Sequence, residues 1–326
     1  MENESSVEGM GTLAKKTILI TGGLGFIGGH LSDLLIRSKC KVIISYYYRD
    51  EQARYNLLKL NKKTTIVRSN ILSLNQTLEL ISKYKIKYIV HLAAESQVTS
   101  AYYKPLNTLN TNVMGTAILL EAARTYGTEG IIIASSDKAY GKSNKPYREK
   151  DALFGDHPYN VSKSSADLIA QTYHKTYNLP VIVTRFGNVY GEADLHFDRL
   201  IPGICKAIVG KKVFEIRSDG KYSRDYINVK DVVSGYMFLI KNLKRFQGSV
   251  FNFSSSDNFS VMDVIFKIER VLGIKIAYRI LNNAVNEIPS QHLIDEKIRK
   301  LGWQTKLNFE KTIPSIFSWY RSYLKK

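Results

Sequence analysis

The chain has 326 residues, of which 44% are hydrophobic and 23% are charged, so it can bury a full core and a second, smaller lobe. No run of 18 or more apolar residues occurs, and the polar first sixteen residues lack the apolar centre of a signal peptide, which argues against a membrane span and an export signal. We expect residues 1–16 to form a disordered lead. The two cysteines, Cys40 and Cys205, form no disulfide framework and suit a cytoplasmic protein.

The charge balance is basic, with 47 lysines and arginines against 29 acidic residues and a formal net charge of +18. The basic residues are scattered, in nothing longer than pairs such as Lys62-Lys63, and neither zinc-ligand spacing nor an RNA-binding aromatic motif accompanies them. We therefore predict a solvated basic surface, compatible with an anionic small substrate, and expect no nucleic-acid partner, membrane partner or metal site.

Short apolar runs alternate with helical patterns in the first part of the chain. The predicted strands are 17–21, 41–47, 64–68, 88–93, 130–135 and 181–185, and the clearest predicted helices are 110–126 and 159–177. This alternation predicts an α/β fold, a Rossmann-type doubly wound parallel sheet with a smaller mixed α/β C-terminal substrate lobe. We assign 17–185 to the dinucleotide-binding domain, with segments around 229–254 returning to it, and 186–326 mainly to the substrate lobe.

A glycine turn follows the first strand in "TILITGGLGFIGGHL". Gly22, Gly25 and Gly28 let the backbone turn tightly and approach a pyrophosphate, whose charge a helix N-terminus stabilises. A glycine-rich turn that merely packs on the sheet is the alternative, but the strand-turn-helix context favours dinucleotide binding.

The second strand ends in "YYYRDEQ", where an acidic residue would read a free ribose hydroxyl. Arg49 could instead hold a 2′-phosphate, and Asp50 could bind the ribose. The sequence thus leans to NADP over NAD without deciding between them.

The stretch "SSDKAYG", residues 135–141, follows the apolar run "IIIA" at the end of a predicted buried strand. In a parallel sheet this end faces the ligand crevice. Ser136, Asp137 and Lys138 therefore become candidate catalytic residues, while Ser135 has no assigned role. An exposed ion pair in a loop is the alternative for Asp137 and Lys138.

Tyr159 and Lys163 stand four residues apart at a predicted helix start and so project from one face. A tyrosine with a reference pKa near 10 needs roughly 4 kcal/mol of stabilisation to act as a base near pH 7, at about 1.4 kcal/mol per pH unit. A nearby lysine ammonium and a positive nicotinamide ring supply such stabilisation. A tyrosine at the domain surface beside an unrelated lysine is the alternative.

Over roughly residues 16–323 the chain resembles the extended short-chain dehydrogenase/reductases of the nucleotide-sugar epimerase and dehydratase branch. The resemblance rests on "TGGLGFIG", "HLAAES", "NTNVMGT", "SSDKAYG", "YNVSK", "RFGNVYG", "SRDYINVKD" and "KIRKLGW". "SSDKAYG", "DLHFDRLIPG" and "EIRSDGKYSRDY" look most like CDP-glucose 4,6-dehydratase-type proteins.

The resemblance implies a role for each matching position. Tyr159 would be the base, Lys163 would bind the nicotinamide ribose, and Ser136 would bond the sugar 4-hydroxyl. The cofactor would also contact Gly22, Gly25, Phe26, Ile27, Gly28, Asn70, Ile71, Leu92, Ala93 and Ala94, with an asparagine where the family usually has an acidic residue. The substrate would contact Glu95, Asn188, Arg199, Arg217 and Arg224, although each arginine could equally be a surface residue.

Three functions remain open on the sequence. A 4,6-dehydratase needs an acid/base pair beyond Ser, Tyr and Lys, and the resemblance offers Asp137 as acid and Lys138 as base at C5. Alternatively, Lys138 stays charged and stabilises a C5 enolate. A 4-epimerase of UDP-hexoses or UDP-N-acetylhexosamines would leave this pair unexplained, and a non-catalytic dinucleotide-sensing or RNA-binding protein would not need Tyr159 and Lys163.

The resemblance also implies a homodimer. The helices at 110–126 and 159–177 match those that form a four-helix bundle between subunits in this family. Leu119, Leu120, Leu168 and Ile169 could serve either that interface or the core.

Overall fold

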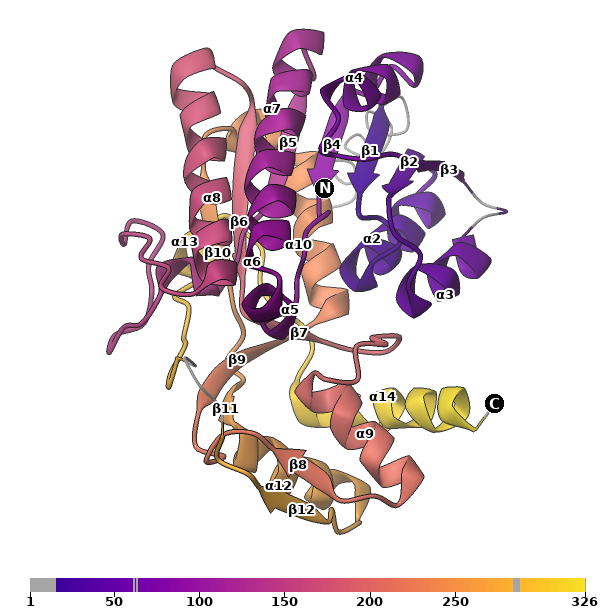
Figure 1. Ribbon diagram of the computed structural model, residues 1–326, viewed down its shortest axis with the longest axis vertical. Helices are drawn as coiled ribbons and strands as arrows, with labels where there is room; N and C mark the ends of the chain where they lie inside the picture. Colours follow the sequence, from indigo (N-terminus) through magenta and orange to yellow (C-terminus); the bar gives the residue numbers. More distant parts are fainter. Residues whose placement is uncertain (1–15, 61, 63, 284–287, 326) are drawn as a thin grey trace, which may run out of the picture. The chain divides into compact units, whose positions relative to one another are not determined.

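The computed structural model describes residues 16–60, 62, 64–283 and 288–325 (Figure 1). The expected lead at 1–16 lies, apart from Lys16, outside the described residues. The chain divides into two compact units. Unit 1 takes the N-terminal part up to Gly141 with Asp151–Arg185 and Val233–Phe251, and unit 2 takes Lys142–Lys150, Phe186–Val232 and the chain from Asn252 onward.

Unit 1 is built on a sheet whose described strands follow the order β10-β6-β5-β4-β1-β2-β3, with parallel pairing from β6 through to β3. The fold-class prediction is confirmed. The strands are β1 (Thr17–Thr21), β2 (Lys41–Tyr46), β3 (Thr65–Arg68), β4 (Tyr88–His91), β5 (Gly130–Ala134), β6 (Val181–Phe186) and β10 (Val250–Phe253).

Helices of unit 1 cover this sheet (Figure 1). Leu80 of α4, Leu119 and Leu120 of α7, and Ala170 of α8 share one buried cluster with the strands. The unit contains α2 (Phe26–Arg37), α3 (Glu51–Leu60), α4 (Leu74–Lys83), α5 (Val98–Tyr103), α6 (Pro105–Leu109), the π-helical turn η1 (Asn110–Met114), α7 (Gly115–Tyr126), the 3₁₀ turn η2 (Asp137–Tyr140), α8 (Pro158–Tyr177), the last part of α10 (Val229–Lys241) and α11 (Leu243–Phe246).

The fourth strand is shorter than its apolar run suggests. The sequence predicts a strand over 88–93, but β4 ends at His91. The backbone of Leu92 and Ala93 instead passes so close to the glycine turn that a Cβ on Gly22 would lie 2.8 Å from Ala93. Leu92 and Ala93 therefore make a close backbone contact with the glycine turn in place of extending β4.

Unit 2 has its own core. Its strands are β7 (Asn188–Tyr190), β8 (Phe214–Ile216), β9 (Ser223–Asn228), β11 (Asn258–Ser260) and β12 (Tyr278–Ile280), in the orders β11-β9-β7 and β12-β8. Its helices are α9 (Leu200–Gly210), α12 (Val261–Leu272), α13 (Glu296–Lys300) and α14 (Phe309–Leu324). Apolar side chains of α9, α12 and α14, such as Ile204, Ile265 and Ile316, form a buried cluster. None of the described helices is long and apolar enough to cross a bilayer.

Candidate active site

The glycine turn between β1 and α2 packs too tightly for any other residue at two of its predicted positions. Gly22 has φ +65°, which favours glycine, and a Cβ on Gly28 would lie 2.3 Å from the carbonyl oxygen of Gly22. Gly25 is the N-cap residue of α2, where no side chain accepts a hydrogen bond from the first backbone amides. The first turn, which contains Phe26 and Ile27, has no acidic residue. The positive end of this helix is therefore left available to an anion.

Asn56 of α3 locks this turn in place. Its amide nitrogen donates to the carbonyl oxygens of Leu24 and Gly25, each at 3.0 Å, and its side chain is buried. A Cβ on Gly29 would collide with it at 2.4 Å. The sequence analysis missed Asn56 because only the folded turn brings it against the glycines, 31 positions away.

The two polar residues after β2 are engaged locally. The Arg49 guanidinium donates to the hydroxyl of Tyr46 at 2.6 and 3.0 Å, and Oδ1 of Asp50 accepts from the amide of Ala53 at 2.7 Å. Both residues are exposed. Arg49 is thus not held in a dedicated phosphate pocket, and the expected lean to NADP gains no support from this arrangement.

After β3, Asn70 uses its side chain to shape the backbone. Its Oδ1 accepts from the amide of Leu72 at 3.0 Å, so the amide group that was expected at the adenine closes a turn. The Ile71 side chain meets the start of α7, where a Cβ on Gly115 would lie 2.6 Å from it.

Asn112 in the π-helical turn η1 organises the loop that follows β4. Its Oδ1 accepts from the amide of Glu95 at 2.8 Å, and its Nδ2 donates to the carbonyl of Glu95 at 3.0 Å and to Oγ of Ser162 at 2.9 Å. The Ser162 hydroxyl donates in turn to the carbonyl of Tyr159 at 2.7 Å. Asn112 therefore ties the loop with Leu92, Ala93, Ala94 and Glu95 to the first turn of α8.

The sequence analysis quoted Asn112 only within "NTNVMGT" and gave it no role. The π-helical turn that aims its side chain at the loop has no signature in the sequence pattern. Such turns occur often at functional sites.

His91, the last residue of β4, is a second residue that sequence reasoning missed. Its Nδ1 lies 2.7 Å from Oγ1 of Thr21, and its Nε2 lies 3.1 Å from Oγ1 of Thr116. Because the Thr116 hydroxyl donates to the carbonyl of Asn112 at 2.6 Å, it accepts from Nε2–H, and Nδ1 accepts from Thr21. Burial, and secondarily the charge of Lys163, lower the pKa of His91 to about 3, so the ring is neutral.

The 3₁₀ turn η2, capped by Ser136, follows the carboxyl end of β5. Oγ of Ser136 caps the turn by accepting from the amide of Lys138 at 3.2 Å, and it donates to Oδ1 of Asp137 at 2.9 Å. Nζ of Lys138 lies 3.6 Å from the same carboxylate oxygen, and the Asp137 side chain is only 3% exposed. Asp137 and Lys138 therefore do not form the exposed ion pair that was the alternative interpretation.

Ser135 is nine-tenths buried, and its Oγ has no hydrogen-bond partner among the described residues. Beside Ser136, it is a hydroxyl available to a bound molecule.

Helix α8 packs against η2 and carries Tyr159 and Lys163, both buried. His157 caps the helix, its Nδ1 accepting from the amide of Tyr159 at 3.2 Å. Nζ of Lys163 donates to the carbonyl of Ala134 at 3.0 Å. Burial lowers the pKa of Lys163 to about 8, against the opposing charge of Asp167.

Unit 1 therefore brings the predicted cofactor positions and the five predicted catalytic residues to the carboxyl ends of its strands. The glycine turn, the helix start free of acid and the orphaned Ser135 hydroxyl fit a dinucleotide.

The other predicted substrate residues lie in unit 2. Arg199 forms an ion pair with the buried Asp194 at 3.0 Å, and this contact gives Arg199 a structural role. Arg217 is exposed, and Asn188 begins β7. The Arg224 guanidinium donates to the carbonyls of Ser223 at 2.8 Å and Pro289 at 3.3 Å.

The residue beside Arg224 anchors this part of unit 2. The buried Asp225 accepts four hydrogen bonds, each 2.7 Å long, from Ser254, Asn258, His292 and the amide of Leu293. Its bond to His292 raises the pKa of that imidazole. The sequence motif "SRDY" contained Asp225, but its partners lie 29 or more positions away.

Known proteins are similar to this chain over most of its length. Residues 19–316 match the family model described as GDP-mannose 4,6 dehydratase. The dTDP-glucose 4,6-dehydratase of Haemophilus influenzae is 30% identical over 93% of this chain and 97% of its own length. A trifunctional UDP-glucose 4,6-dehydratase, epimerase and reductase of Arabidopsis thaliana is also 30% identical, but this chain spans only 48% of its length.

Two solved structures share the fold over 94% of the chain. The dTDP-glucose 4,6-dehydratase DesIV of Streptomyces venezuelae, solved with NAD, has a TM-score of 0.86, 26% identity and 97% of its own chain covered. The UDP-glucose 4-epimerase of Thermotoga maritima has a TM-score of 0.85, 25% identity and 99% covered. These proteins act by name on dTDP- and UDP-sugars, so they do not support the expected likeness to CDP-glucose dehydratases. The chain belongs to the GDP-mannose 4,6 dehydratase family, within the extended short-chain dehydrogenase/reductases that comprise nucleotide-sugar dehydratases and epimerases.

Proposed function

We propose that this protein is a nucleotide-sugar 4,6-dehydratase that converts an NDP-hexose into the NDP-4-keto-6-deoxyhexose. The observation that carries the proposal is the Asp137–Lys138 pair, held in η2 directly after Ser136 with its carboxylate buried. A 4-epimerase needs only to oxidise and reduce C4, so it has no use for this pair. A dehydratase must also move a proton off C5 and release the C6 hydroxyl.

The oxidation half of the reaction uses residues of β5 and α8. Bound NAD would accept the hydride from C4 and return it to C6. Tyr159 would take the proton of the C4 hydroxyl, which Ser136 orients. Lys163, fixed by the carbonyl of Ala134, would supply the positive charge that favours the tyrosinate.

The elimination half would fall to Asp137 and Lys138. For Lys138 to take the C5 proton it must be neutral, and for Asp137 to protonate the leaving O6 it must carry a proton. Transfer of one proton across the 3.6 Å contact, from the ammonium to the carboxylate, produces both states at once. In the other route Lys138 stays charged and stabilises the C5 enolate.

For the cofactor we propose NAD rather than NADP. Arg49 is bonded to Tyr46 and exposed, and the similar DesIV structure contains NAD. For the substrate we propose an NDP-hexose, with Arg224 and Asn188 as contacts to its diphosphate and Glu95 as a sugar contact.

The test is to incubate the purified protein with CDP-, dTDP-, UDP- and GDP-hexoses and to analyse the products by mass spectrometry and NMR. We expect one nucleotide to give a product that has lost one water and carries a 4-ketone. Formation of only the C4 epimer, with the C6 oxygen retained, would overturn the proposal in favour of an epimerase.

Variants of Lys138 separate the two elimination routes. Lys138→Ala should bind NAD normally and form the C4 ketone without eliminating water, with turnover reduced by about 10²-fold or more. Lys138→Arg keeps the charge but cannot act as a base near pH 7. Elimination retained in the arginine variant would establish the charged route, and elimination lost would establish the base route.

A further inference from the structure

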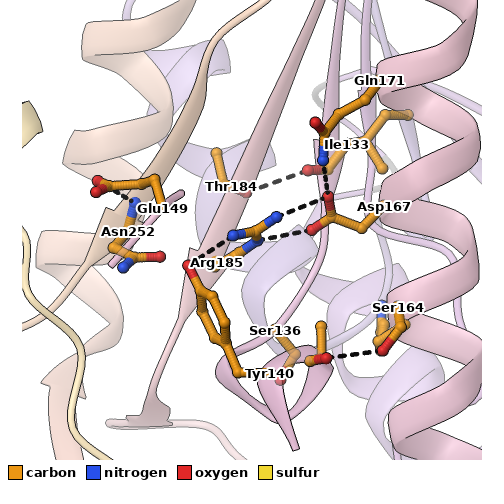
Figure 2. Close-up of polar contacts among 12 residues, drawn as sticks. Ile133, Ser136, Tyr140, Glu149, Ser164, Asp167, Gln171, Thr184, Arg185 and Asn252 are labelled. Atoms are coloured by element: carbon orange, nitrogen blue, oxygen red, sulfur yellow. Dashed lines mark hydrogen bonds and ion pairs between the residues drawn. The ribbon is translucent and has the colours of Figure 1, made fainter. Parts of the chain in front are cut away.

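A buried ion pair joins α8 to β6, close to the 3₁₀ turn η2 that carries Asp137 and Lys138 (Figure 2). Nε of Arg185 donates to Oδ2 of Asp167 at 2.8 Å, and its Nη2 donates to Oδ1 at 3.0 Å. The two side chains are 1% and 0% exposed. This bidentate geometry is the strongest that an arginine and a carboxylate can adopt.

The same guanidinium holds the catalytic turn. Its Nη1 donates to the hydroxyl of Tyr140, the last residue of η2, at 2.6 Å, and its Cζ lies 4.6 Å from the centre of the Tyr140 ring. Figure 2 shows the tyrosine, the guanidinium and the Asp167 carboxylate in one continuous row. The row thus joins the turn that begins at Ser136 to the helix that carries Lys163.

Asp167 also stands one helical turn after Lys163 on α8, on the same face. Burial disfavours the ammonium of Lys163, and the charge of Asp167 opposes that effect. Both nearby carboxylates are paired, Asp167 with Arg185 and Asp137 with Lys138, but only Asp167 shares the helical face of Lys163, and His91 is neutral. The other titratable groups on the elements around Lys163 are His91 on β4, Arg185 on β6, Tyr159 on α8, and Asp137, Lys138 and Tyr140 on η2.

A buried ion pair is seldom needed for stability alone, because apolar side chains of equal volume often serve as well. We propose that Asp167 and Arg185 are positioning residues of the active site. The Asp167 carboxylate keeps Lys163 in its ammonium form, and the Arg185 guanidinium clamps Tyr140, which fixes the Ser136 turn against α8. The inference rests on the proposed roles of Ser136, Tyr159 and Lys163.

The electrostatic half predicts shifts of opposite sign in the titration of Lys163. Asp167→Asn removes the anion and leaves the guanidinium unneutralised, so Lys163 should titrate about one pH unit lower than in the wild type. Arg185→Met leaves the anion unneutralised, so Lys163 should titrate higher. Both shifts can be measured by NMR titration of protein labelled with [ε-¹³C]lysine. The Lys163 signal is identified by its loss in Lys163→Arg.

This measurement needs no substrate, so it remains informative even if the protein proves to be no dehydratase. Shifts in the same direction, or unchanged titration in both variants, would overturn the electrostatic half. If a single variant does not fold, the neutral double variant Asp167→Asn/Arg185→Met replaces it, and Lys163 should then titrate lower than in the wild type but higher than in Asp167→Asn, because the anion and the cation are lost together.

Tyr140→Phe tests the clamp with both charges intact. We expect faster amide hydrogen exchange at residues 137–140, by about five-fold or more for the loss of one hydrogen bond to a charged group, with the Lys163 titration unchanged. Equal exchange rates in variant and wild type would overturn the clamp. In the working enzyme the clamp predicts a lower kcat with little change in KM, since Tyr140→Phe leaves the proposed contacts to the substrate's diphosphate in place.

Discussion

Two buried basic side chains of unit 1, His91 and Lys163, differ in their response to burial. His91 stays neutral because burial disfavours its charged form, while Thr21 and Thr116 satisfy both ring nitrogens without a charge. Burial lowers the pKa of Lys163 only to about 8, because the carbonyl of Ala134 and the Asp167 carboxylate favour its charged form. Lys163 is thus a buried amine with a pKa of about 8, close to the pH at which Tyr159 would have to work as the proposed base.

The neutral His91 ring predicts a measurable effect on stability. In the unfolded chain His91 binds a proton below its usual pKa of 6.5, whereas in the folded chain it does so only below about 3. Between these values the unfolded state binds more protons, so the free energy of unfolding falls as the pH falls, by up to about 1.4 kcal/mol per pH unit from this group.

His91→Gln should remove that one proton from the balance. We expect its free energy of unfolding, measured in urea between pH 4 and 6, to fall less steeply with decreasing pH than that of the wild type. Identical slopes would show that His91 takes up its proton in the folded state. His174→Gln, on a partly buried histidine of α8, is the matched control.

At the scale of elements, the π-helical turn η1 connects three parts of unit 1. Through Asn112 it holds the loop after β4 by two hydrogen bonds to Glu95 and the start of α8 by one to Ser162. The loop carries predicted cofactor contacts, and the start of α8 carries Tyr159. Displacing either would therefore disturb the geometry on which proton transfer depends.

Asn112→Ala should lower the free energy of unfolding by about 2–4 kcal/mol, because it removes three buried hydrogen bonds and leaves their partners unsatisfied. We also expect weaker NAD binding by calorimetry. Asn110→Ala, in the same turn but exposed, should change neither quantity. Equal effects of the two substitutions would contradict the role given to Asn112.

At the scale of the whole molecule, apolar side chains remain exposed on one group of neighbouring helices in unit 1. They include Leu106 on α6 at 69% exposure, Met114 on η1 at 51% and Leu168 on α8 at 52%. Leu119 and Leu120, by contrast, are fully buried in the core and cannot form an interface, and Ile169 packs against that core. We propose that the face of α6, η1 and α8 is where two copies associate.

Light scattering at micromolar concentration should therefore find a dimer. Leu168→Glu should produce a monomer, because it places a charge in the proposed interface. Leu58→Glu, at a leucine of α3 that is 80% exposed, should leave the dimer intact. A monomeric wild type, or a Leu168→Glu variant that still dimerises, would rule out this interface.

The sequence predicted what depends on local pattern and failed where distant residues meet. Alternating apolar runs located the strands of the large sheet within a few residues, and glycine spacing located the turn before α2. Asn56, Asn112 and the Asp167–Arg185 pair were missed because their partners lie 17 to 50 positions away and no periodicity marks them. The lean to NADP gained no support for a different reason: the Arg49 guanidinium is bonded to Tyr46, only three residues back.

The central claim, dehydration rather than epimerisation, is tested most directly by the fate of the hydrogen on C4. The accepted NDP-hexose is prepared with deuterium at C4, and the product is examined by NMR and mass spectrometry. The account predicts a product that has lost one water and carries the deuterium at C6. Deuterium still at C4, in a product that retains its C6 oxygen, would contradict it.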